Sequence, residues 1–167
     1  MLAIFRTRSA ALLPLMLVTA LVATMFALAP TADAASRRQQ KIGTGLDVVR
    51  NQKGDPYQYG ADGPGRFDCS GLTYYSYRKA GFRNIPRTSN QQAKFMNRIA
   101  KRRNMRKGDF VFFYDGAAKA RNVYHMGVFA GWKDGRRTII HAPYGGKNVH
   151  RSKIWTGSWF PGTLRGL

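Results

Sequence analysis

The sequence contains a single cysteine, Cys69, in 167 residues. One cysteine cannot form an internal disulfide, so a disulfide framework is excluded. Three roles remain open to this side chain: an intermolecular disulfide, a buried small residue, or a reactive thiol. The count alone favours burial, because free cysteine is among the most buried residue types.

Acidic residues are also scarce. Eight Asp and Glu residues stand against 28 Lys and Arg residues, which gives a formal net charge of +20 at pH 7. Such an excess attracts anionic partners over long distances, and nucleic acid and an anionic cell envelope are the two candidates. The alternative is that the charge only keeps the surface soluble.

The first 34 residues have the pattern of an export signal. Arg6 and Arg8 precede an uncharged run over residues 10–29, and Ala32-Asp33-Ala34 supplies a small-x-small cleavage motif. The run is long enough to span a bilayer, so an uncleaved anchor is the alternative. We expect cleavage after the motif, no stable membrane insertion afterwards, and a secreted, wall-associated protein. Export makes the envelope, not nucleic acid, the expected partner.

No internal repeat, low-complexity tract or long linker divides the remaining 133 residues. This length is enough for one domain with a proper core. We interpret residues 35–43 as a flexible basic lead-in and residues 44–167 as one folded domain, which we expect to be a monomer.

The order of the predicted elements indicates an α+β fold. Helices are expected over 44–51, over 67–80, and from Ser89, where Ser89 and Gln92 would form a capping box. Strands are expected over 110–114, 123–132 and 137–142, and Trp155, Trp159 and Phe160 are expected to add late core or edge strands. Helices first and strands afterwards predict N-terminal helices packed on a mostly antiparallel sheet.

Two histidines, His125 and His141, lie in apolar predicted strands, whereas His150 lies in a polar stretch. Most strand histidines are hydrogen-bonded core residues. Together with Cys69 at a helix start, however, the pair supplies a nucleophile, a base and an orienting group. We expect the helix N-terminus and an imidazolium to lower the thiol pKa, and the Cys69 N–H to stabilise an oxyanion. A zinc site is the competing interpretation, but no paired-ligand spacing supports it, and no metal or other cofactor is expected.

The hairpin between the two histidines offers a geometric test. A plain two-residue turn at Asp134-Gly135 would place His141 opposite Val128, and the two imidazoles would then face opposite sides of the sheet. A catalytic pair must share a face. We therefore predict a bulge or an odd-length loop, for example Lys133-Asp134-Gly135 with His141 opposite Gly127.

Six short sequence blocks occur in a specific order, and they are Asp55–Gly60, Phe67–Leu72, Pro86–Ser89, Lys107–Phe113, His125–Val128 and Ile140–Pro143. Together they resemble the NlpC cell-wall peptidases, which are papain-like cysteine enzymes, and the resemblance covers about residues 44–162. The resemblance implies cleavage of peptidoglycan stem peptides, commonly between D-glutamate and a diamino acid such as diaminopimelate. It also implies that Cys69 is the nucleophile, His125 the base and His141 the orienting residue.

The resemblance assigns three further residues. Tyr57 matches a tyrosine that assists the oxyanion site, and Asp68 and Ser70 match positions that can contact the substrate. The alternatives are loop packing for Tyr57 and helix capping for Asp68 and Ser70. Ala61 stands where many members of the family have a second glycine after the tyrosine loop, which is a mild departure from the family pattern.

The sequence constrains the substrate and the physiological role less than it constrains the reaction chemistry. No LysM or SH3-like module accompanies the domain, so the positive charge is expected to hold the enzyme to anionic wall polymers. An amidase or acyl transferase on the same scaffold, and a non-catalytic basic wall-binding or antimicrobial protein, remain alternatives.

Overall fold

The computed structural model describes residues 32–165, and the chain divides after Ala35 into two units. The features below lie in the second unit, apart from the first turn of one helix. The predicted export signal falls almost entirely outside the described residues, so its cleavage stays a prediction. No helix within the described residues is long and apolar enough to cross a membrane.

Helix α2 (Ala32–Asn51) replaces the flexible lead-in that was expected over 35–43. The buried residues of this helix share one face, and they are Ile42, Leu46 and Val49. The Arg38 side chain donates a hydrogen bond to the carbonyl of Leu164. The prediction of a flexible lead-in is therefore wrong, because the residues of the basic run extend the helix whose apolar stripe begins at Ile42.

Helix α3 (Cys69–Lys79) begins with the cysteine, two residues after the predicted start. Asp68 sets this boundary. Its backbone is extended, and its side chain accepts a hydrogen bond from the Gly71 N–H at 2.6 Å, as an N-cap residue does. Gly81, with φ of +92°, follows the end of the helix as predicted. The structure confirms that a helix N-terminus presents the thiol.

Helix α4 (Ser89–Phe95) has a capping box one residue earlier than predicted. Thr88 and Gln91 form the box, and each side chain bonds to the backbone N–H of the other residue. Gln92, which the sequence placed in the box, is instead fully buried. Its side-chain amide donates to the Ser70 carbonyl at 3.0 Å, which ties α4 to α3 next to the cysteine.

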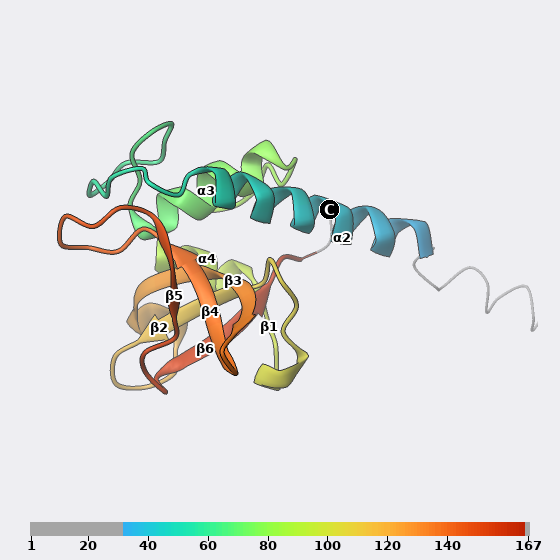
Figure 1. Ribbon diagram of the computed structural model, residues 1–167. Helices are drawn as coiled ribbons and strands as arrows, with labels where there is room; N and C mark the ends of the chain where they lie inside the picture. Colours follow the sequence, from blue (N-terminus) through green and yellow to red (C-terminus); the bar gives the residue numbers. More distant parts are fainter. Residues whose placement is uncertain (1–31, 166–167) are drawn as a thin grey trace, which may run out of the picture. The chain divides into compact units, whose positions relative to one another are not determined.

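Six antiparallel strands form one sheet over the described residues, in the order β1-β6-β2-β3-β4-β5. They are β1 (Asn97–Arg98), β2 (Phe110–Tyr114), β3 (Val123–Lys133), β4 (Arg136–His141), β5 (His150–Lys153) and β6 (Trp159–Thr163). Helices α3 and α4 lie on one side of the sheet and contact β3 (Figure 1). The α+β fold is confirmed, and the three clearest predicted strands match within one residue at each end.

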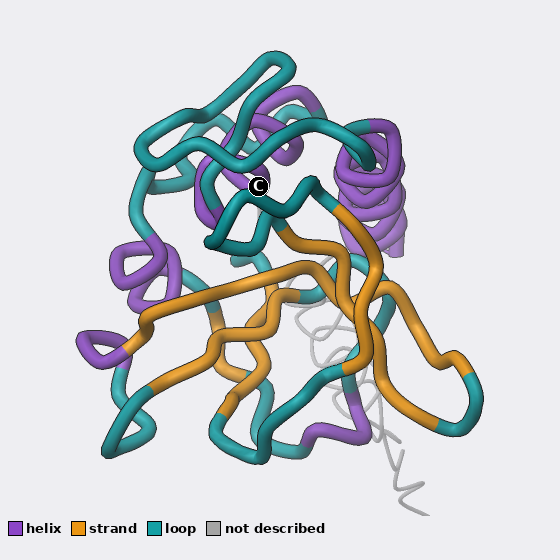
Figure 2. Tube along the Cα trace, turned by 60° about the vertical axis from the view of Figure 1, so that its left-hand side comes forward, coloured by secondary structure: helices purple, strands orange, loops and turns teal. Residues whose placement is uncertain are grey.

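The core is built around β2, which is buried on both faces. Phe110 and Phe112 point into the main core beneath the helices, and Val111 and Phe113 point into a second cluster on the opposite face. Helices α3 and α4 pack on the face of the main core (Figure 2). Strand β3 pairs with this buried strand, and Phe113 of β2 lies opposite His125 of β3.

The β3–β4 hairpin contains a bulge at the position where the register has to change. The turn at Asp134-Gly135 is the plain two-residue kind, with Lys133 opposite Arg136. The register then shifts between Phe129 and Gly131, so that Val128 pairs with Ile140. The predicted bulge is confirmed, whereas the three-residue loop offered as an example is wrong. In this register the two strand histidines share a face.

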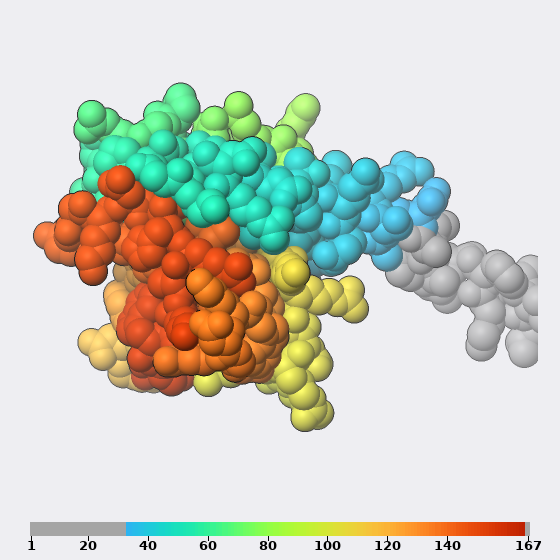
Figure 3. Space-filling model, in the orientation of Figure 1, coloured from blue at the N-terminus to red at the C-terminus, as the bar shows by residue number. Residues whose placement is uncertain are grey.

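Two loops lie side by side beyond one end of the sheet, and they are residues 54–68 and 142–149. The Gly54 N–H donates to the Val149 carbonyl at 2.9 Å, and the Tyr57 N–H donates to the Lys147 carbonyl at 3.3 Å. Their surfaces meet on the face shown in the space-filling view (Figure 3). These loops carry most of the side chains that surround the cysteine and the histidines.

Candidate active site

Cys69 is partly buried, and its sulfur lies among backbone N–H groups. Those of Cys69 itself, Ser70 and Met126 each favour the thiolate by hydrogen bonding. Met126 follows His125 directly on β3, so the start of α3 faces the part of the strand that bears this histidine. The predicted nucleophile therefore lies next to the residue that follows the predicted base.

Burial controls the protonation of both groups. It raises the pKa of Cys69 to about 11, with a further contribution from the negative charge of Asp68. It lowers the pKa of His125 to about 4. At neutral pH the pair therefore consists of a thiol and a neutral imidazole. The expectation of a lowered thiol pKa is wrong, because desolvation outweighs the N–H groups at the helix terminus.

His125, His141 and Ser152 form a hydrogen-bonded chain. The His125 Nε2 lies 2.7 Å from the His141 Nδ1, and the His141 Nε2 lies 3.0 Å from the Ser152 Oγ. If His125 keeps Nδ1 free to accept a proton, its Nε2–H donates to His141, and the Nε2–H of His141 donates to Ser152. In that tautomer Ser152 accepts from His141 and orients the ring that contacts His125. No sequence pattern had indicated this serine.

Trp155 covers the two histidines from the loop between β5 and β6. Its ring stacks on Phe113 at 4.3 Å, and it lies 5.8 Å from the ring of His125 and 5.4 Å from that of His141. An indole in this position excludes water from one side of the imidazole pair. The sequence predicted only a late core or edge residue, so this contact was missed.

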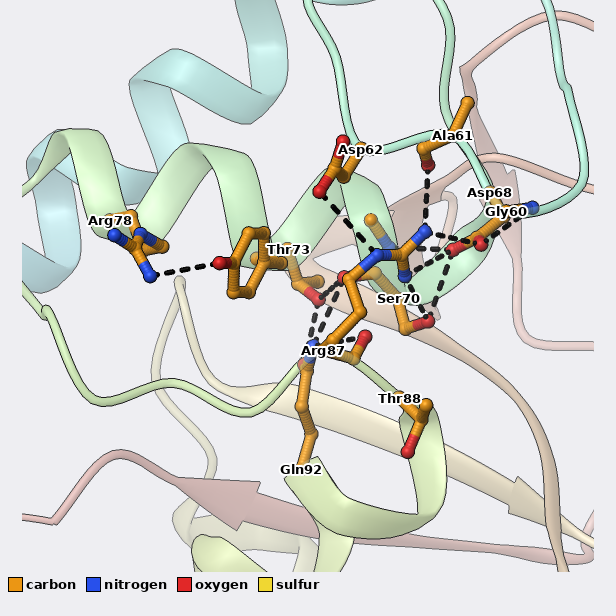
Figure 4. Close-up of polar contacts among 12 residues, drawn as sticks. Gly60, Ala61, Asp62, Asp68, Ser70, Thr73, Arg78, Arg87, Thr88 and Gln92 are labelled. Carbon is orange, nitrogen blue, oxygen red and sulfur yellow. Dashed lines mark hydrogen bonds and ion pairs between the residues drawn. The ribbon is translucent and has the colours of Figure 1, made fainter.

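Asp68, which directly precedes the cysteine, forms an ion pair with Arg87, and Figure 4 shows this pair with its neighbours. The Arg87 Nη2 donates to the Asp68 Oδ2 at 2.7 Å, and its Nη1 donates to the Ser70 Oγ at 3.1 Å. The Ser70 hydroxyl in turn donates to the Asp68 Oδ1 at 3.0 Å. Burial would raise the pKa of Asp68, but hydrogen bonds from Arg87, the Gly71 N–H and Ser70 hold it below its usual value.

These contacts show what Asp68 and Ser70 do in the fold. Asp68 caps α3, as the structural alternative proposed, and Ser70 is held between Asp68 and Arg87. Arg87 also reaches the Ala61 carbonyl at 3.1 Å, so it joins three separate segments. The sequence showed Arg87 only as part of a motif, since nothing in its local context reveals a partner 19 residues away.

Tyr57 lies close enough to the thiol to be affected by its charge. Burial raises the pKa of Tyr57 first, followed by the charges of Cys69 and Asp68. Its ring also meets Tyr144 edge-on, with centroids 5.7 Å apart. The phenol therefore keeps its proton at neutral pH and can donate a hydrogen bond near the sulfur. The predicted position of Tyr57 beside the cysteine fits this placement.

Two pockets adjoin the cysteine and the histidines. The thiol-side pocket, of about 380 Å³, is lined by residues that include Tyr57, Asp68, Cys69, Ser70 and Arg87. The imidazole-side pocket, of about 450 Å³, is lined by residues that include His125, His141, Lys147, His150, Ser152 and Lys153. Tyr124 lines both pockets and so marks where they meet. The arrangement suits an extended substrate that crosses the thiol–imidazole pair.

The zinc site that competed with the catalytic interpretation can be compared with the arrangement of the side chains. Within residues 32–165, no group of three or more His, Cys and Asp side chains is arranged to hold a metal ion. Asp68, the carboxylate next to the thiol, is paired with Arg87.

The comparisons with known proteins agree on one family. Residues 54–166 match the model of the NlpC/P60 family. A probable endopeptidase of Corynebacterium glutamicum (strain R) is 39% identical over 115 residues, which are 68% of this chain and 49% of that protein. The murein DD-endopeptidase MepH of Escherichia coli (strain K12) is 30% identical over 131 residues, which are 77% of this chain and 46% of that protein.

A solved structure gives the same answer for the fold. The NlpC/p60 domain of the peptidoglycan hydrolase SagA superposes with a TM-score of 0.63 at 25% identity, covering 74% of this chain and 98% of that domain. The fold is papain-like, with a cysteine-bearing helix against an antiparallel sheet. The chain belongs to the NlpC/P60 family, as its motif blocks predicted. It spans about half the length of the two relatives described above.

Proposed function

We propose that the chain is a secreted cysteine endopeptidase that hydrolyses peptidoglycan stem peptides between D-glutamate and a diamino acid such as diaminopimelate. The observation that carries the proposal is Cys69 at the N-terminus of α3, facing the strand on which His125 makes its 2.7 Å contact with His141. The family match and the names of the relatives support the reaction class.

The first half of the reaction is attack by the thiol. As the sulfur of Cys69 bonds to the scissile carbonyl carbon, its proton passes to the Nδ1 of His125. The carbonyl oxygen becomes an oxyanion, which accepts hydrogen bonds from the Cys69 N–H and the Tyr57 hydroxyl. The C–N bond then breaks, and His125 returns the proton to the leaving amine. A thioester remains on Cys69.

The second half is hydrolysis of that thioester. His125 accepts a proton from water as its oxygen attacks the thioester carbon, and Cys69 leaves as the thiol after the proton is returned. His141 stabilises the transient imidazolium by accepting its Nε2–H at 2.7 Å. Because both groups begin neutral, the proton transfer has to occur during the attack rather than before it.

The thiol-side pocket is suited to the acyl part of the substrate, because it contains the sulfur and the oxyanion donors. Asp68 and Ser70 line it while also capping and bracing α3. An amine on the substrate would share the Asp68 carboxylate with Arg87. In this proposal the capping and substrate-contact roles are compatible.

The cell envelope is the proposed place of action. The formal net charge of +20 favours adsorption to anionic wall polymers, and the predicted export signal would deliver the chain there. Binding to isolated walls should weaken with added salt if this attraction operates.

The scissile bond is tested by mass analysis of the fragments that the full chain releases from purified peptidoglycan. New C-terminal D-glutamate and new N-terminal diaminopimelate support the proposed bond. Release of fragments cut between two D-centres would instead indicate the DD specificity in the name of the Escherichia coli relative. Release of intact stem peptides from the glycan would indicate an amidase.

A further inference from the structure

A further pocket, which we call the arginine pocket, has a volume of about 300 Å³ and is lined by residues that include Arg102, Trp132, Arg136, Arg137 and Trp159. It shares no lining residue with the thiol-side and imidazole-side pockets. None of its lining residues within the described part of the chain is acidic. Three guanidinium groups therefore gather at one place outside the candidate active site.

The charges of these three arginines are not balanced by the chain itself. None of them forms an ion pair with a carboxylate within residues 32–165. Asp134, which lies two residues before Arg136, instead pairs with Lys153 at 3.2 Å. Like charges at close quarters repel each other, so the folded chain gains no stability from their proximity. A bound anion would offset this repulsion.

Two of the guanidinium groups are held in position by indole rings. The Arg137 Cζ lies 4.5 Å from the ring centroid of Trp132, the residue opposite it on β3. The Arg102 Cζ lies 4.1 Å from the ring centroid of Trp159, and its Nη2 donates to the carbonyl of that residue. Cations that are fixed before binding lose less conformational entropy when a ligand arrives. Arg102 also braces β6, which leaves Arg136 and Arg137 as the main contacts for a ligand.

The segment between β5 and β6 separates the arginine pocket from the two strand histidines. Ile154 and Thr156 line the arginine pocket, whereas Lys153 and Trp155, which alternate with them, line the imidazole-side pocket. A ligand in the arginine pocket therefore leaves the imidazole-side pocket open. The chain can hold a polymer on one side of this segment and a peptide on the other.

We propose that the arginine pocket binds the phosphodiester groups of an anionic polyol polymer of the cell wall. Guanidinium groups recognise phosphate through two parallel hydrogen bonds. One face of each indole already carries a guanidinium, so the pocket presents cations rather than the open aromatic faces on which nucleic-acid bases stack. The inference rests on the proposed place of action, and it replaces a diffuse attraction by the net charge with a defined site.

The test is titration of the full chain with a short glycerol phosphate oligomer at physiological ionic strength. Arg136→Gln/Arg137→Gln should raise the Kd about tenfold, the value of one charge-assisted hydrogen bond. Lys119→Gln/Arg121→Gln is the matched control, because it removes two charges from exposed side chains outside the arginine pocket and both active-site pockets. It should raise the Kd about twofold at most.

Two variants that keep the net charge separate a site from a diffuse attraction. Trp132→Leu removes the exposed ring that positions Arg137 and should raise the Kd about threefold. Arg136→Lys/Arg137→Lys should recover only part of the affinity that the glutamine variant loses, since an ammonium cannot bind phosphate through a fork. Equal losses in the two glutamine double variants, or full affinity in Trp132→Leu, would overturn the site.

Two further measurements fix the ligand and the relation to catalysis. Tighter binding of a thymidine oligonucleotide with the same number of phosphates, lost in Arg136→Gln/Arg137→Gln, would overturn the wall polymer as the ligand. Hydrolysis of a soluble stem peptide should be unchanged in that variant, and a loss there would overturn the separation of the two sites. If the wild type bound the oligomer through these arginines but hydrolysed neither peptide nor peptidoglycan, the proposed function would fail and the binding site would stand.

Discussion

His125 and His141 face the same side of the β3–β4 hairpin because β3 contains one residue more than β4 between them. The extra residue lies between Phe129 and Gly131, where the register shifts. Without it, the two-residue turn would have turned the imidazoles to opposite faces. The 2.7 Å contact between their Nε2 and Nδ1 atoms is the result. A local irregularity of one strand thus sets the geometry of the candidate site.

Gly131→Ala should destabilise the bulge. Gly131 has φ of +98°, which L-residues rarely adopt, and a new Cβ would lie 2.8 Å from the Lys107 Cε. We expect a loss of about 1–2 kcal/mol in the free energy of unfolding, measured by urea denaturation.

Gly157→Ala is the control for this change, because its φ is ordinary and no atom lies within 4 Å of the new Cβ. It should alter the free energy of unfolding by no more than about 0.5 kcal/mol. Equal effects of the two substitutions would contradict the backbone strain expected at Gly131.

The protonation of the thiol should be visible in its ultraviolet absorbance. With the pKa of Cys69 raised to about 11 and that of His125 lowered to about 4, both groups are neutral between these values. The wild type minus Cys69→Ala difference spectrum should show no thiolate at neutral pH. The kcat/KM should rise as the pH increases through about 4, where His125 becomes a base, and then stay level through neutrality.

An ion pair formed before substrate binding would behave differently. It would show thiolate absorbance at neutral pH, and activity would fall as the pH rose through the pKa of the imidazolium. Either observation would contradict the neutral pair described above.

Ser152→Ala should reduce turnover by loosening the tautomer of His141. Without the Ser152 Oγ, His141 loses the acceptor for its Nε2–H and can place the proton on Nδ1, where it opposes His125. We expect kcat to fall about tenfold with little change in KM.

Two further variants test whether the loss of kcat in Ser152→Ala comes from the hydrogen bond to His141. Ser152→Thr keeps a hydroxyl and should recover most of kcat, whereas Ser158→Ala removes an exposed hydroxyl elsewhere and should change nothing. If Ser152→Ala and Ser152→Thr lost kcat equally, a hydrogen bond would not be the cause.

Arg87→Met should cost about 2 kcal/mol in the free energy of unfolding, because it leaves the Asp68 carboxylate partly buried without its cation. Arg87→Lys should recover only part of this loss, since an ammonium cannot reach the acceptors on Asp68, Ser70 and Ala61 together.

The double variant Arg87→Met/Asp68→Asn separates the stabilisation due to the ion pair from the stabilisation due to side-chain packing. Removing both charges should be less destabilising than the sum of the two single changes, as urea denaturation would show in a double-mutant cycle. Strict additivity would mean that the two side chains do not stabilise each other.

The sequence was most informative where chemistry depends on local context. A capped helix start at Cys69, apolar strands around His125 and His141, and the need for a shared face were enough to predict a bulge in the hairpin. That bulge exists between Phe129 and Gly131. Local propensity and side-chain alternation are properties of short segments, so a single sequence can express them.

The features that were missed depend on distant contacts or on burial. Arg87 meets Asp68 across 19 residues, and Ser152 meets His141 across two neighbouring strands. The direction of the Cys69 pKa shift was wrong for a related reason: a helix N-terminus is visible in the sequence, whereas the desolvation that outweighs it is a property of the folded chain.

The measurement that tests the central claim most directly compares the wild-type chain with Cys69→Ala on purified peptidoglycan, with hydrolysis and wall binding followed in the same samples. If Cys69 is the nucleophile, hydrolysis should fall at least about a thousandfold while binding is retained. Unchanged lysis by Cys69→Ala would contradict the account and indicate a basic wall-binding or antimicrobial protein in which the thiol has no catalytic role.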